Sequence, residues 1–340
     1  MTTKFILSKS KVLEQYNKVK AIADIVSYSS KTNPIVTKIL EQTDSWFSIH
    51  LKNELKNIND KSRILFLAQA WNEKDIEELL RLGINRFVVD NEPDLDTLLN
   101  HLKNKEDKIT LFLRLKLKEH SIRTEKYFVF GMQADIINKR IKELKDNQDI
   151  EKLGIHFHLR TQNLSEWNYQ PEIEHSIKHL EMIDYINIGG GLPSEYANTN
   201  VEVINSIFKK IKELKVWLNQ KNISLILEPG RFISAPAVKL VAEIIGIYDN
   251  NIIINASVYN SDMDALIVPV KLLIENEVSK EDGKPFVIKG ITPCSMDIFR
   301  YRVYLKNPKI GDELVFLNAG AYNFYTDFCE LDKIETEVVE

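Results

Sequence analysis

The sequence is short of cysteine and of long hydrophobic runs. Its 340 residues include two cysteines, Cys294 and Cys329, which are too few for a disulfide framework and lack metal-ligand spacing. No apolar stretch approaches the roughly 18 residues that a transmembrane helix needs, and residues 1–15 contain no hydrophobic leader segment. We therefore expect a soluble, untargeted cytoplasmic protein with no metal site and no membrane partner.

An excess of positive charge is also missing. The chain has 45 lysines and arginines against 49 aspartates and glutamates, which gives a net charge of −4. The two signs are interspersed along the chain, so no basic stripe is present that would attract a phosphate backbone. Nucleic acid is therefore not an expected partner.

Short apolar runs alternate with amphipathic helical stretches, such as 73–83 and 203–220, over most of the chain. This alternation is typical of a parallel sheet with helices outside it. About eight such units favour a closed TIM-like (β/α)8 barrel, whose active site lies at the C-terminal ends of the strands. The predicted strands are 25–29, 46–50, 64–68, 86–90, 111–117, 154–159, 185–189 and 225–228.

The pattern changes after the stretch "EPGRFISAPAVKL" to strand-like runs separated by turn residues, with little helix. We predict a barrel domain over residues 9–236 and a C-terminal all-β domain over 237–340. Residues 1–8 contain a further strand-like run, "TKFILS", which we expect to join the β domain.

Polar residues stand at or near the end of almost every predicted strand. A doubly wound open sheet would show the same alternation of strands and helices, but it would not explain these polar ends. The pattern therefore favours the closed barrel. The residues are Lys31, His50, Gln69, Asp90, Arg114, His158, Gly189–Gly191 and Glu228.

Three of these stretches together have the chemistry that pyridoxal 5′-phosphate (PLP) requires. Lys31 can form an imine, the triple glycine of "NIGGGLP" lets the backbone approach an anion, and "EPGR" adds a carboxylate and an arginine. Each has a plainer explanation by itself, because a triple glycine also makes a tight turn and Glu228 with Arg231 makes a local ion pair. Their joint presence favours the cofactor.

The order of the motifs along the chain resembles that of one enzyme family. "YSSKTNP", "GIHFHLRTQ", "NIGGGLP", "EPGRF", "TPCSMD" and "GDELVFLNAGAY" are similar to the motif series of the fold-type III PLP-dependent decarboxylases of ornithine, diaminopimelate, arginine and carboxynorspermidine. The resemblance runs from the first predicted barrel strand to about Tyr322. It implies a barrel followed by a β domain, PLP as cofactor, an amino acid as substrate and a homodimer with shared active sites.

The resemblance also implies roles for individual residues. Lys31 would be the Schiff-base lysine, Glu228 would pair with the pyridine nitrogen, and His158 would stack on the cofactor ring. Cys294 would return a proton to Cα, reaching it across a dimer interface. The other implied cofactor-binding residues are Arg114, Thr161, Gly189, Gly190, Gly191, Gly230, Arg231 and Tyr322.

The specificity region departs from the family pattern. Ser295 follows Cys294 where ornithine and diaminopimelate enzymes have an acid, and Val268 stands where diaminopimelate enzymes have an arginine. Asp264 and Asp297 remain candidates for contact with a distal substrate ammonium, although such aspartates are often turn residues. We therefore predict decarboxylation of a basic or diamino acid, such as ornithine, lysine or a polyamine precursor.

Several alternatives stay open on the sequence alone. The chain could act on diaminopimelate or on a biosynthetic intermediate, for example one of the siderophore type. It could also be a racemase with the same domain layout, a PLP-binding regulatory homologue without activity, or a phosphate-sugar barrel without PLP. The "EPGR" and "TPCSMD" stretches favour decarboxylation over racemisation.

Overall fold

The computed structural model describes residues 2–103, 105–117 and 129–340, and the chain divides into two compact units. The barrel unit comprises residues 16–193 and 203–230, and the β unit comprises residues 1–15, 194–202 and 231–340. This division differs from the predicted domain limits because residues 9–15, 194–202 and 231–236 group with the β unit. No helix in the described ranges is both long and apolar enough to cross a membrane.

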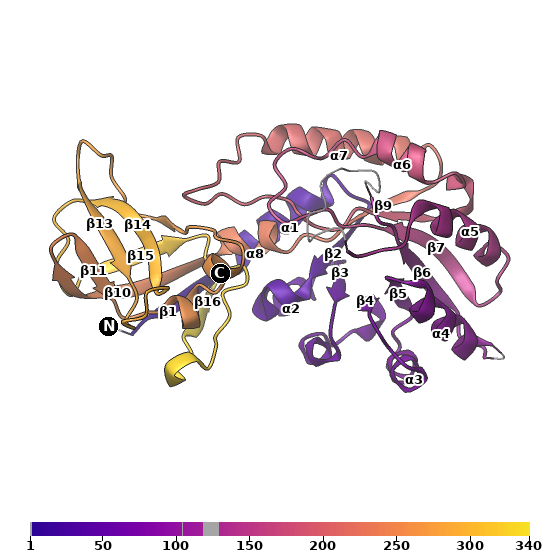
Figure 1. Cartoon of the computed structure of the whole chain (residues 1–340), viewed down its shortest axis with the longest axis horizontal. Coiled ribbons are helices and arrows are strands. Elements are labelled where there is room, and N and C mark those ends of the chain that lie inside the picture. Colours follow the sequence, from indigo (N-terminus) through magenta and orange to yellow (C-terminus); the bar gives the residue numbers. More distant parts are fainter. Residues whose placement is uncertain (1, 104, 118–128) are drawn as a thin grey trace. The chain divides into compact units, whose positions relative to one another are not determined.

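Within the described part of the barrel unit, eight parallel strands form a closed barrel, which confirms the predicted fold class. Each strand pairs with the next in chain order, and β9 returns to β2, where Ile226 lies opposite Ile25. Figure 1 shows helices outside this ring of strands. The strands are β2 (Ile25–Ser29), β3 (Trp46–Ile49), β4 (Ile64–Ala68), β5 (Arg86–Val89), β6 (Ile109–Arg114), β7 (Ile150–His156), β8 (Tyr185–Asn187) and β9 (Ser224–Leu227).

Helix α3 (Glu73–Arg81) shows how the sequence defines the outer layer. Asn72 caps it by accepting hydrogen bonds from two backbone N–H groups, which stabilises a helix by about 1 kcal/mol. Ile76 and Leu79 form its buried stripe. The chain then turns at Gly83, whose φ of 82° favours glycine. The other long helices are α1 (Lys9–Lys20), α2 (Pro34–Leu40), α4 (Glu92–Leu102), α5 (Ala134–Leu144), α6 (Gln170–Ser176) and α7 (Ile204–Asn219).

Apolar side chains fill the inside of the barrel. Leu65, Val88, Phe112 and Ile226 come from four different strands and form a buried cluster. Phe112 also packs against Tyr185 of β8, with ring centroids 5.7 Å apart. Burial of each aliphatic or aromatic side chain contributes about 1.5–3 kcal/mol, so this cluster fixes the strands whose ends carry the polar residues.

Six of the eight strands end one to three residues before their predicted limits, at the ends that carry polar residues, and the difference is largest in β6 and β7. β6 ends at Arg114 rather than at residue 117, and β7 ends at His156 rather than at residue 159. Leu115 lies in an isolated bridge beyond β6, and His158 lies in the loop after β7. The alternating pattern of the sequence therefore continues past the last residues of the two strands.

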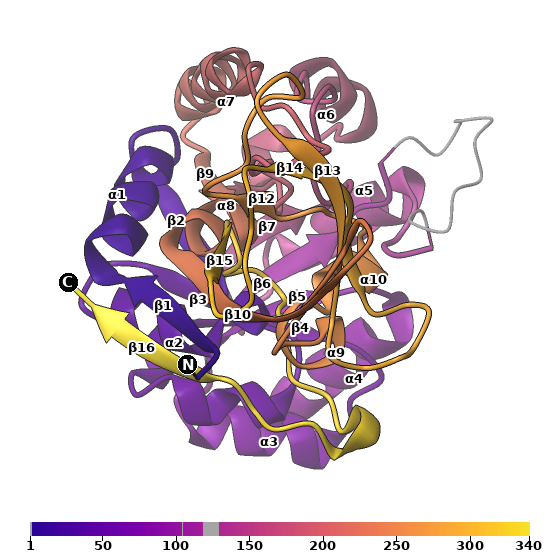
Figure 2. The same ribbon diagram turned by 90° about the vertical axis from the view of Figure 1, so that its left-hand side faces the viewer.

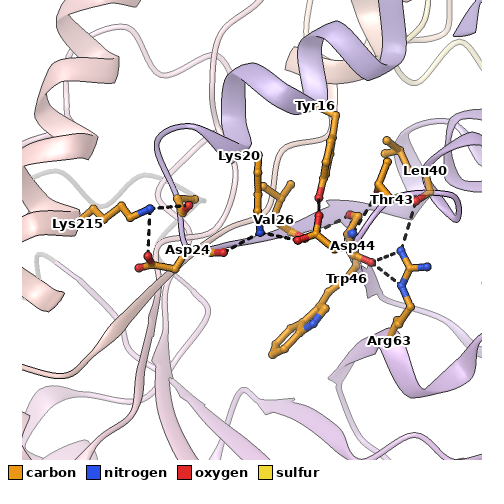
Figure 3. A network of polar contacts seen from close by, with 12 residues as sticks. Tyr16, Lys20, Asp24, Val26, Leu40, Thr43, Asp44, Trp46, Arg63 and Lys215 are labelled. Carbon is orange, nitrogen blue, oxygen red and sulfur yellow. Dashed lines mark hydrogen bonds and ion pairs between the residues drawn. The ribbon is translucent and has the colours of Figure 1, made fainter. Parts of the chain in front are cut away.

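A network of ion pairs and hydrogen bonds ties helices to the barrel floor, by which we mean the N-terminal ends of the strands (Figure 3). Lys20 of α1 lies 2.7 Å from Asp44 and donates to the carbonyl oxygen of Asp24. Tyr16 donates to Asp44 at 2.5 Å, and Lys215 of α7 lies 3.1 Å from Asp24. Because Asp24 precedes β2 and Asp44 precedes β3, this floor network holds α1 and α7 to the beginnings of both strands.

The β unit is built on a mostly antiparallel sheet with the order β12-β15-β10-β11-β13-β14. β1 (Lys4–Ser8) pairs antiparallel with β10 and parallel with β16, and Figure 2 shows β1 beside β16. The other strands are β10 (Val238–Tyr248), β11 (Asn251–Ile254), β12 (Leu273–Ile274), β13 (Lys284–Lys289), β14 (Ile298–Leu305), β15 (Glu313–Leu317) and β16 (Glu335–Val339). The described helices of this unit after α1 are short: α8 (Arg231–Ser234), α9 (Val258–Ser261) and α10 (Asp264–Ile267).

Candidate active site

Glu228 is the centre of a polar cluster at the barrel mouth, by which we mean the C-terminal ends of the strands. It follows β9 and is buried. Its Oε1 accepts hydrogen bonds from Ser48 Oγ at 2.8 Å and Asn187 Nδ2 at 3.0 Å. Its Oε2 lies 3.3 Å from His156 Nε2. Three different strands therefore present polar groups to one carboxylate.

This cluster keeps Glu228 charged. Burial by itself would raise the pKa of Glu228, but His156 and the hydrogen bonds from His156, Asn187 and Ser48 outweigh burial and hold the pKa below its usual range. A second hydroxyl, of Ser27, lies 2.7 Å from Ser48 Oγ and extends the cluster to β2. The barrel mouth thus contains a fixed negative charge.

Lys31 lies in the 3-10 turn Ser30–Thr32 that follows β2. Asn33 ends this turn, and its side chain accepts hydrogen bonds from two backbone N–H groups at the start of α2, with Pro34 as the first helical residue. The lysine side chain is exposed in the mouth, yet desolvation by the surrounding protein lowers the pKa of Lys31. Glu228 acts in the opposite direction, so the two residues lie close enough to interact.

His158 is held by the glycine turn. The Gly190 N–H group donates to His158 Nδ1 at 3.2 Å, which makes Nδ1 the acceptor and leaves Nε2 to carry the proton. Desolvation, together with the neighbouring His156, lowers the pKa of His158 to about 4. The imidazole is therefore neutral near pH 7, which is compatible with the predicted stacking of His158 on the cofactor ring.

The glycines after β8 bring three loops together. Added Cβ atoms at Gly189, Gly190 and Gly191 would lie 2.7, 2.6 and 2.4 Å from backbone oxygens of neighbouring loops, so no side chain fits here. Two of the three N–H groups are used inside the protein, because Gly189 donates to Asn187 Oδ1 at 2.9 Å and Gly190 donates to His158. Close packing at the mouth is thus one demonstrable function of this turn.

Two more of the predicted cofactor residues lie beside these loops. A Cβ at Gly230 would lie 2.2 Å from Thr32 Oγ1, so the turn after Glu228 packs directly on the turn that carries Lys31. The Pro229 carbonyl oxygen also accepts a hydrogen bond from Ser29 at 3.1 Å. Thr161 is half-buried in the loop that follows β7.

Arg114 ends β6 and pairs with Asp90 at the end of β5, where Nη1 and Oδ1 are 3.1 Å apart. The same carboxylate oxygen accepts from the Gly131 N–H group at 3.1 Å. The guanidinium also lies 4.7 Å from the ring centroid of Phe130. Burial lowers the pKa of Arg114, while Asp90 and Glu228 oppose the shift. The structure thus brings Lys31, Arg114, His158 and Glu228 to one end of the barrel.

The sequence assigned no role to several residues of this site. Ser48, His156 and Asn187 contact Glu228 directly, and the side chains of His50 and Glu54 lie close enough to affect the pKa of Lys31 or to be affected by it. Ser48, His50 and Asn187 each stand at a strand end, which was the available signal. Only their contacts identify them as members of the site.

In the β unit, Arg231 is paired inside the protein. Its guanidinium donates to both carboxylate oxygens of Asp264, at 3.0 Å for Nη2 to Oδ1, and to the hydroxyl of Tyr196 at 2.8 Å. The ring of Tyr322 lies 5.2 Å from the same guanidinium. The side chains of Arg231, Asp264 and Tyr196 are all buried. Asp264 is thus bound by Arg231, and its contact with a substrate ammonium stays a prediction.

Asp297 is fully buried and its carboxylate is bound by the protein. Oδ1 accepts from the Val258 N–H group at 2.9 Å, and Oδ2 accepts from the N–H and the hydroxyl of Thr292 at 3.1 and 2.7 Å. Gly290 makes room, because a Cβ there would lie 2.1 Å from Oδ1. Asp297 therefore fastens the loop before β14 to α9, and the substrate role suggested for it stays a prediction.

Cys294 is half-buried in this same loop, with its Sγ 3.0 Å from the hydroxyl oxygen of Tyr259. The hydrogen bond from Tyr259, with a second from the backbone of Met296, lowers the pKa of the Cys294 thiol. Cys329, the second cysteine, is exposed.

The residues of the barrel mouth fit PLP. The buried polar atoms that have no hydrogen-bond partner in the described part of the chain include Nδ1 of His50, Oε2 of Glu54 and Nδ1 of His156. Unpaired buried atoms of this kind are costly unless a ligand or water meets them. They lie around an amine with a lowered pKa and a fixed carboxylate, the two groups that an aldehyde and a pyridine nitrogen need. In the described residues no group of His, Cys, Asp and Glu could hold a metal ion.

Comparisons with solved structures agree with this fold. The chain superposes on lysine/ornithine decarboxylase from Vibrio vulnificus complexed with putrescine with a TM-score of 0.82 at 22% identity, covering 100% of this chain and 94% of that one. It superposes on diaminopimelate decarboxylase from Helicobacter pylori complexed with L-lysine with a TM-score of 0.83 at 19% identity, covering 100% and 92%.

Curated relatives extend over most of the chain. It is 25% identical to diaminopimelate decarboxylase of Aquifex aeolicus, covering 95% of this chain and 82% of that protein. It is 22% identical to lysine/ornithine decarboxylase of Selenomonas ruminantium (87% and 78%) and to antizyme inhibitor 2 of Xenopus laevis (91% and 73%). The family model of the pyridoxal-dependent decarboxylases, in its pyridoxal binding domain, matches residues 9–235. The chain therefore belongs to the pyridoxal-dependent decarboxylases, and its barrel is their pyridoxal-binding domain.

Proposed function

We propose that this protein decarboxylates a basic or diamino acid of the ornithine or lysine kind, with PLP attached to Lys31. The observation that carries the proposal is the cluster around Glu228, in which Ser48, Asn187 and His156 hold a buried carboxylate in its charged form. A purely structural barrel has no need of such a charge beside an amine whose pKa is lowered.

The positions of Lys31, Glu228 and His158 suggest a separate role for each residue in the reaction. Bound PLP supplies an aldehyde that condenses with amines and a ring that accepts electrons. Lys31 offers an amine whose lowered pKa increases its neutral, nucleophilic fraction. Glu228 holds the negative charge that favours a protonated ring nitrogen, and neutral His158 offers the face of its ring.

We assign the phosphate group to the glycine-rich side of the site. Gly189, Gly190, Gly191 and Gly230 allow a close approach of the backbone, and Thr161 offers a hydroxyl. Arg231 and Tyr322 complete the proposed set. The Nε atom of Arg231 supports its place here, because it is buried without a partner among the described residues. Arg114 contributes a further positive charge at the barrel mouth.

We further propose that Cys294 returns the proton to Cα and that it does so across a homodimer interface. Mixing the inactive variants Lys31→Ala and Cys294→Ala tests both ideas. If each site combines Lys31 of one subunit with Cys294 of the other, a mixed dimer has one working site of two. Random assortment makes about half of the dimers mixed, so an equimolar mixture regains roughly a quarter of the wild-type activity. No regained activity under conditions where subunits exchange would contradict the shared site.

The substrate class rests on the names of the relatives and on one residue of this chain. Solved neighbours are complexed with putrescine, cadaverine or L-lysine. Val268 stands where a diaminopimelate enzyme would hold a second carboxylate with arginine, which favours a substrate without that group. We expect CO2 release from ornithine or lysine to exceed release from diaminopimelate in a panel of amino acids. The reverse order would contradict this choice.

A second candidate is a regulatory homologue without activity, which the relative named antizyme inhibitor 2 brings into consideration. The same panel separates the two proposals. A regulatory homologue would release no CO2 from any amino acid in the presence of PLP. The paired environment of Glu228 and the lowered pKa of Lys31 favour the enzyme.

A further inference from the structure

The loop that carries Cys294 is fastened to the segment that carries Tyr259. Asp297 connects Thr292 of the loop to Val258, the residue before Tyr259. The Ile291 N–H group also donates to the carbonyl oxygen of Ala256 at 2.9 Å. These bonds are independent of the contact between the thiol and the phenol. They therefore fix the separation of the two backbone segments, whether or not the side chains of Cys294 and Tyr259 contact each other.

Tyr259 itself is held in place on three sides. Its ring stacks on Phe328, with centroids 3.9 Å apart and an interplanar angle of 25°. Its carbonyl oxygen accepts from the N–H and the hydroxyl of Thr326 at 3.1 and 2.9 Å. Its N–H group donates to Ser257 Oγ at 3.2 Å. The phenol therefore has little freedom to leave Cys294, whose Sγ is 3.0 Å from it.

We propose that Tyr259 is a positioning residue for the proton-donating thiol of Cys294, an inference that rests on the role proposed above for Cys294. In that role the S–H bond breaks, the proton goes to the substrate carbon that has lost CO2, and both electrons stay on Sγ. The O–H group of Tyr259 donates to the thiolate that results. Hydrogen bonds to an ionised acceptor are stronger than neutral ones, so the phenol makes the thiol a better acid.

The pKa shifts of the two groups agree with this role. The bond to Cys294 raises the pKa of Tyr259 to about 12, with burial acting in the same direction. The same bond lowers the pKa of the Cys294 thiol. The thiol therefore ionises before the phenol, and Tyr259 remains a donor throughout the neutral range.

Alkylation of the thiol tests the inference without relying on turnover. Tyr259→Phe removes the hydroxyl and keeps the ring that stacks on Phe328, and Cys329→Ser in the same chain leaves Cys294 as the reacting thiol. We expect the pH profile of iodoacetamide alkylation of the full-length protein to shift upward by about one unit, which slows alkylation about tenfold below the pKa. Tyr301→Phe, on the exposed face of β14, is the matched control and should leave the profile unchanged.

A second variant covers the case in which Tyr259→Phe folds poorly. Thr326→Val keeps the phenol but removes one of its fastenings, and we expect a smaller shift in the same direction. An unchanged profile in a folded Tyr259→Phe protein would overturn the inference, even if Cys294→Ser lowers CO2 release. Full CO2 release by Cys294→Ser would instead overturn the role of Cys294, and the catalytic meaning of Tyr259 with it. Lowered CO2 release by Tyr259→Phe near neutral pH, with the decline at alkaline pH moved to a higher pH than in the parent protein, supports the inference.

Discussion

The two ends of the barrel treat polar residues in opposite ways. At the floor, Asp24 and Asp44 meet Lys215, Lys20 and Tyr16 at 2.5–3.1 Å, so that charges and donors are matched within the protein. At the mouth, polar groups are also close together, but buried atoms among them have no partner in the described residues. Asn85 Oδ1 at the floor and the carboxylate of Asp262 in the β unit also lack a partner among the described residues, so the gathering of such atoms around Lys31 and Glu228, rather than any single one, indicates where a ligand belongs.

Substituting one lysine at each end, Lys31 at the mouth and Lys20 at the floor, is the strongest test of this comparison. Lys31→Ala at the mouth removes the proposed attachment point and should lower CO2 release by about a thousandfold or more. Lys20→Ala at the floor should leave the turnover of the folded protein unchanged and reduce its melting temperature. CO2 assays and thermal melts on both variants measure the contrast. Turnover that survives in Lys31→Ala would contradict the account.

Glu228→Gln sharpens the comparison at the mouth. The substitution keeps the size of the side chain and one acceptor oxygen, but it removes the charge and replaces the other oxygen with an NH2 donor. We expect kcat to fall about a hundredfold or more, within the range of a group that acts on proton position, with a smaller change in KM. Glu41→Gln is the matched control, because Glu41 lies in the turn between α2 and β3, where it accepts hydrogen bonds from Asn59. Equal kcat values for Glu228→Gln and the parent would show that the charge has no function.

Asp24→Ala tests the floor. It removes the ion pair to Lys215 and the acceptor of the Leu225 N–H group, which lies 2.8 Å from Asp24. We expect a loss of about 1–3 kcal/mol in the free energy of unfolding, and kcat per folded molecule should not change. Chemical denaturation followed by circular dichroism measures the first quantity. A normal stability with reduced kcat would reverse the roles assigned to the two ends.

The pH dependence of stability gives the smallest expected effect. Desolvation, with Lys31 as the next cause, lowers the pKa of His50 to about 3, below the value of about 6.5 for an unfolded histidine. The unfolded chain therefore binds the extra proton first, so this part of the stability is complete above pH 6.5 and declines as the pH falls toward 3. His50→Leu should flatten the decline in denaturation experiments between pH 7 and 4. His179→Leu, outside the mouth, is the control, and an equal decline in both variants would contradict the assignment.

The sequence predicted the barrel well because its signals are local. The strand limits 25–29 and 64–68 match β2 and β4, since short apolar runs bounded by polar residues leave few alternatives. Lys31, His158 and Glu228 were found because each stands beside a strand end. These features depend on neighbours within the same segment.

The contacts that complete the site could not be predicted in this way. Asp264 joins Arg231 over 33 residues, and Asp297 joins Val258 over 39 residues. Both aspartates were assigned to the substrate, because the sequence does not show that a buried guanidinium or backbone donor already occupies them. The same limit applies to Ser48, which is 180 residues from Glu228. Separation along the chain, rather than residue type, marks where sequence-based prediction ended.

Locating the covalent attachment point tests the central claim most directly. The purified protein, loaded with PLP, is reduced with borohydride, digested and analysed by mass spectrometry. We predict a pyridoxyl adduct on Lys31 and its loss in Lys31→Ala. An adduct on a different lysine, or a loaded protein without any adduct, would contradict the account.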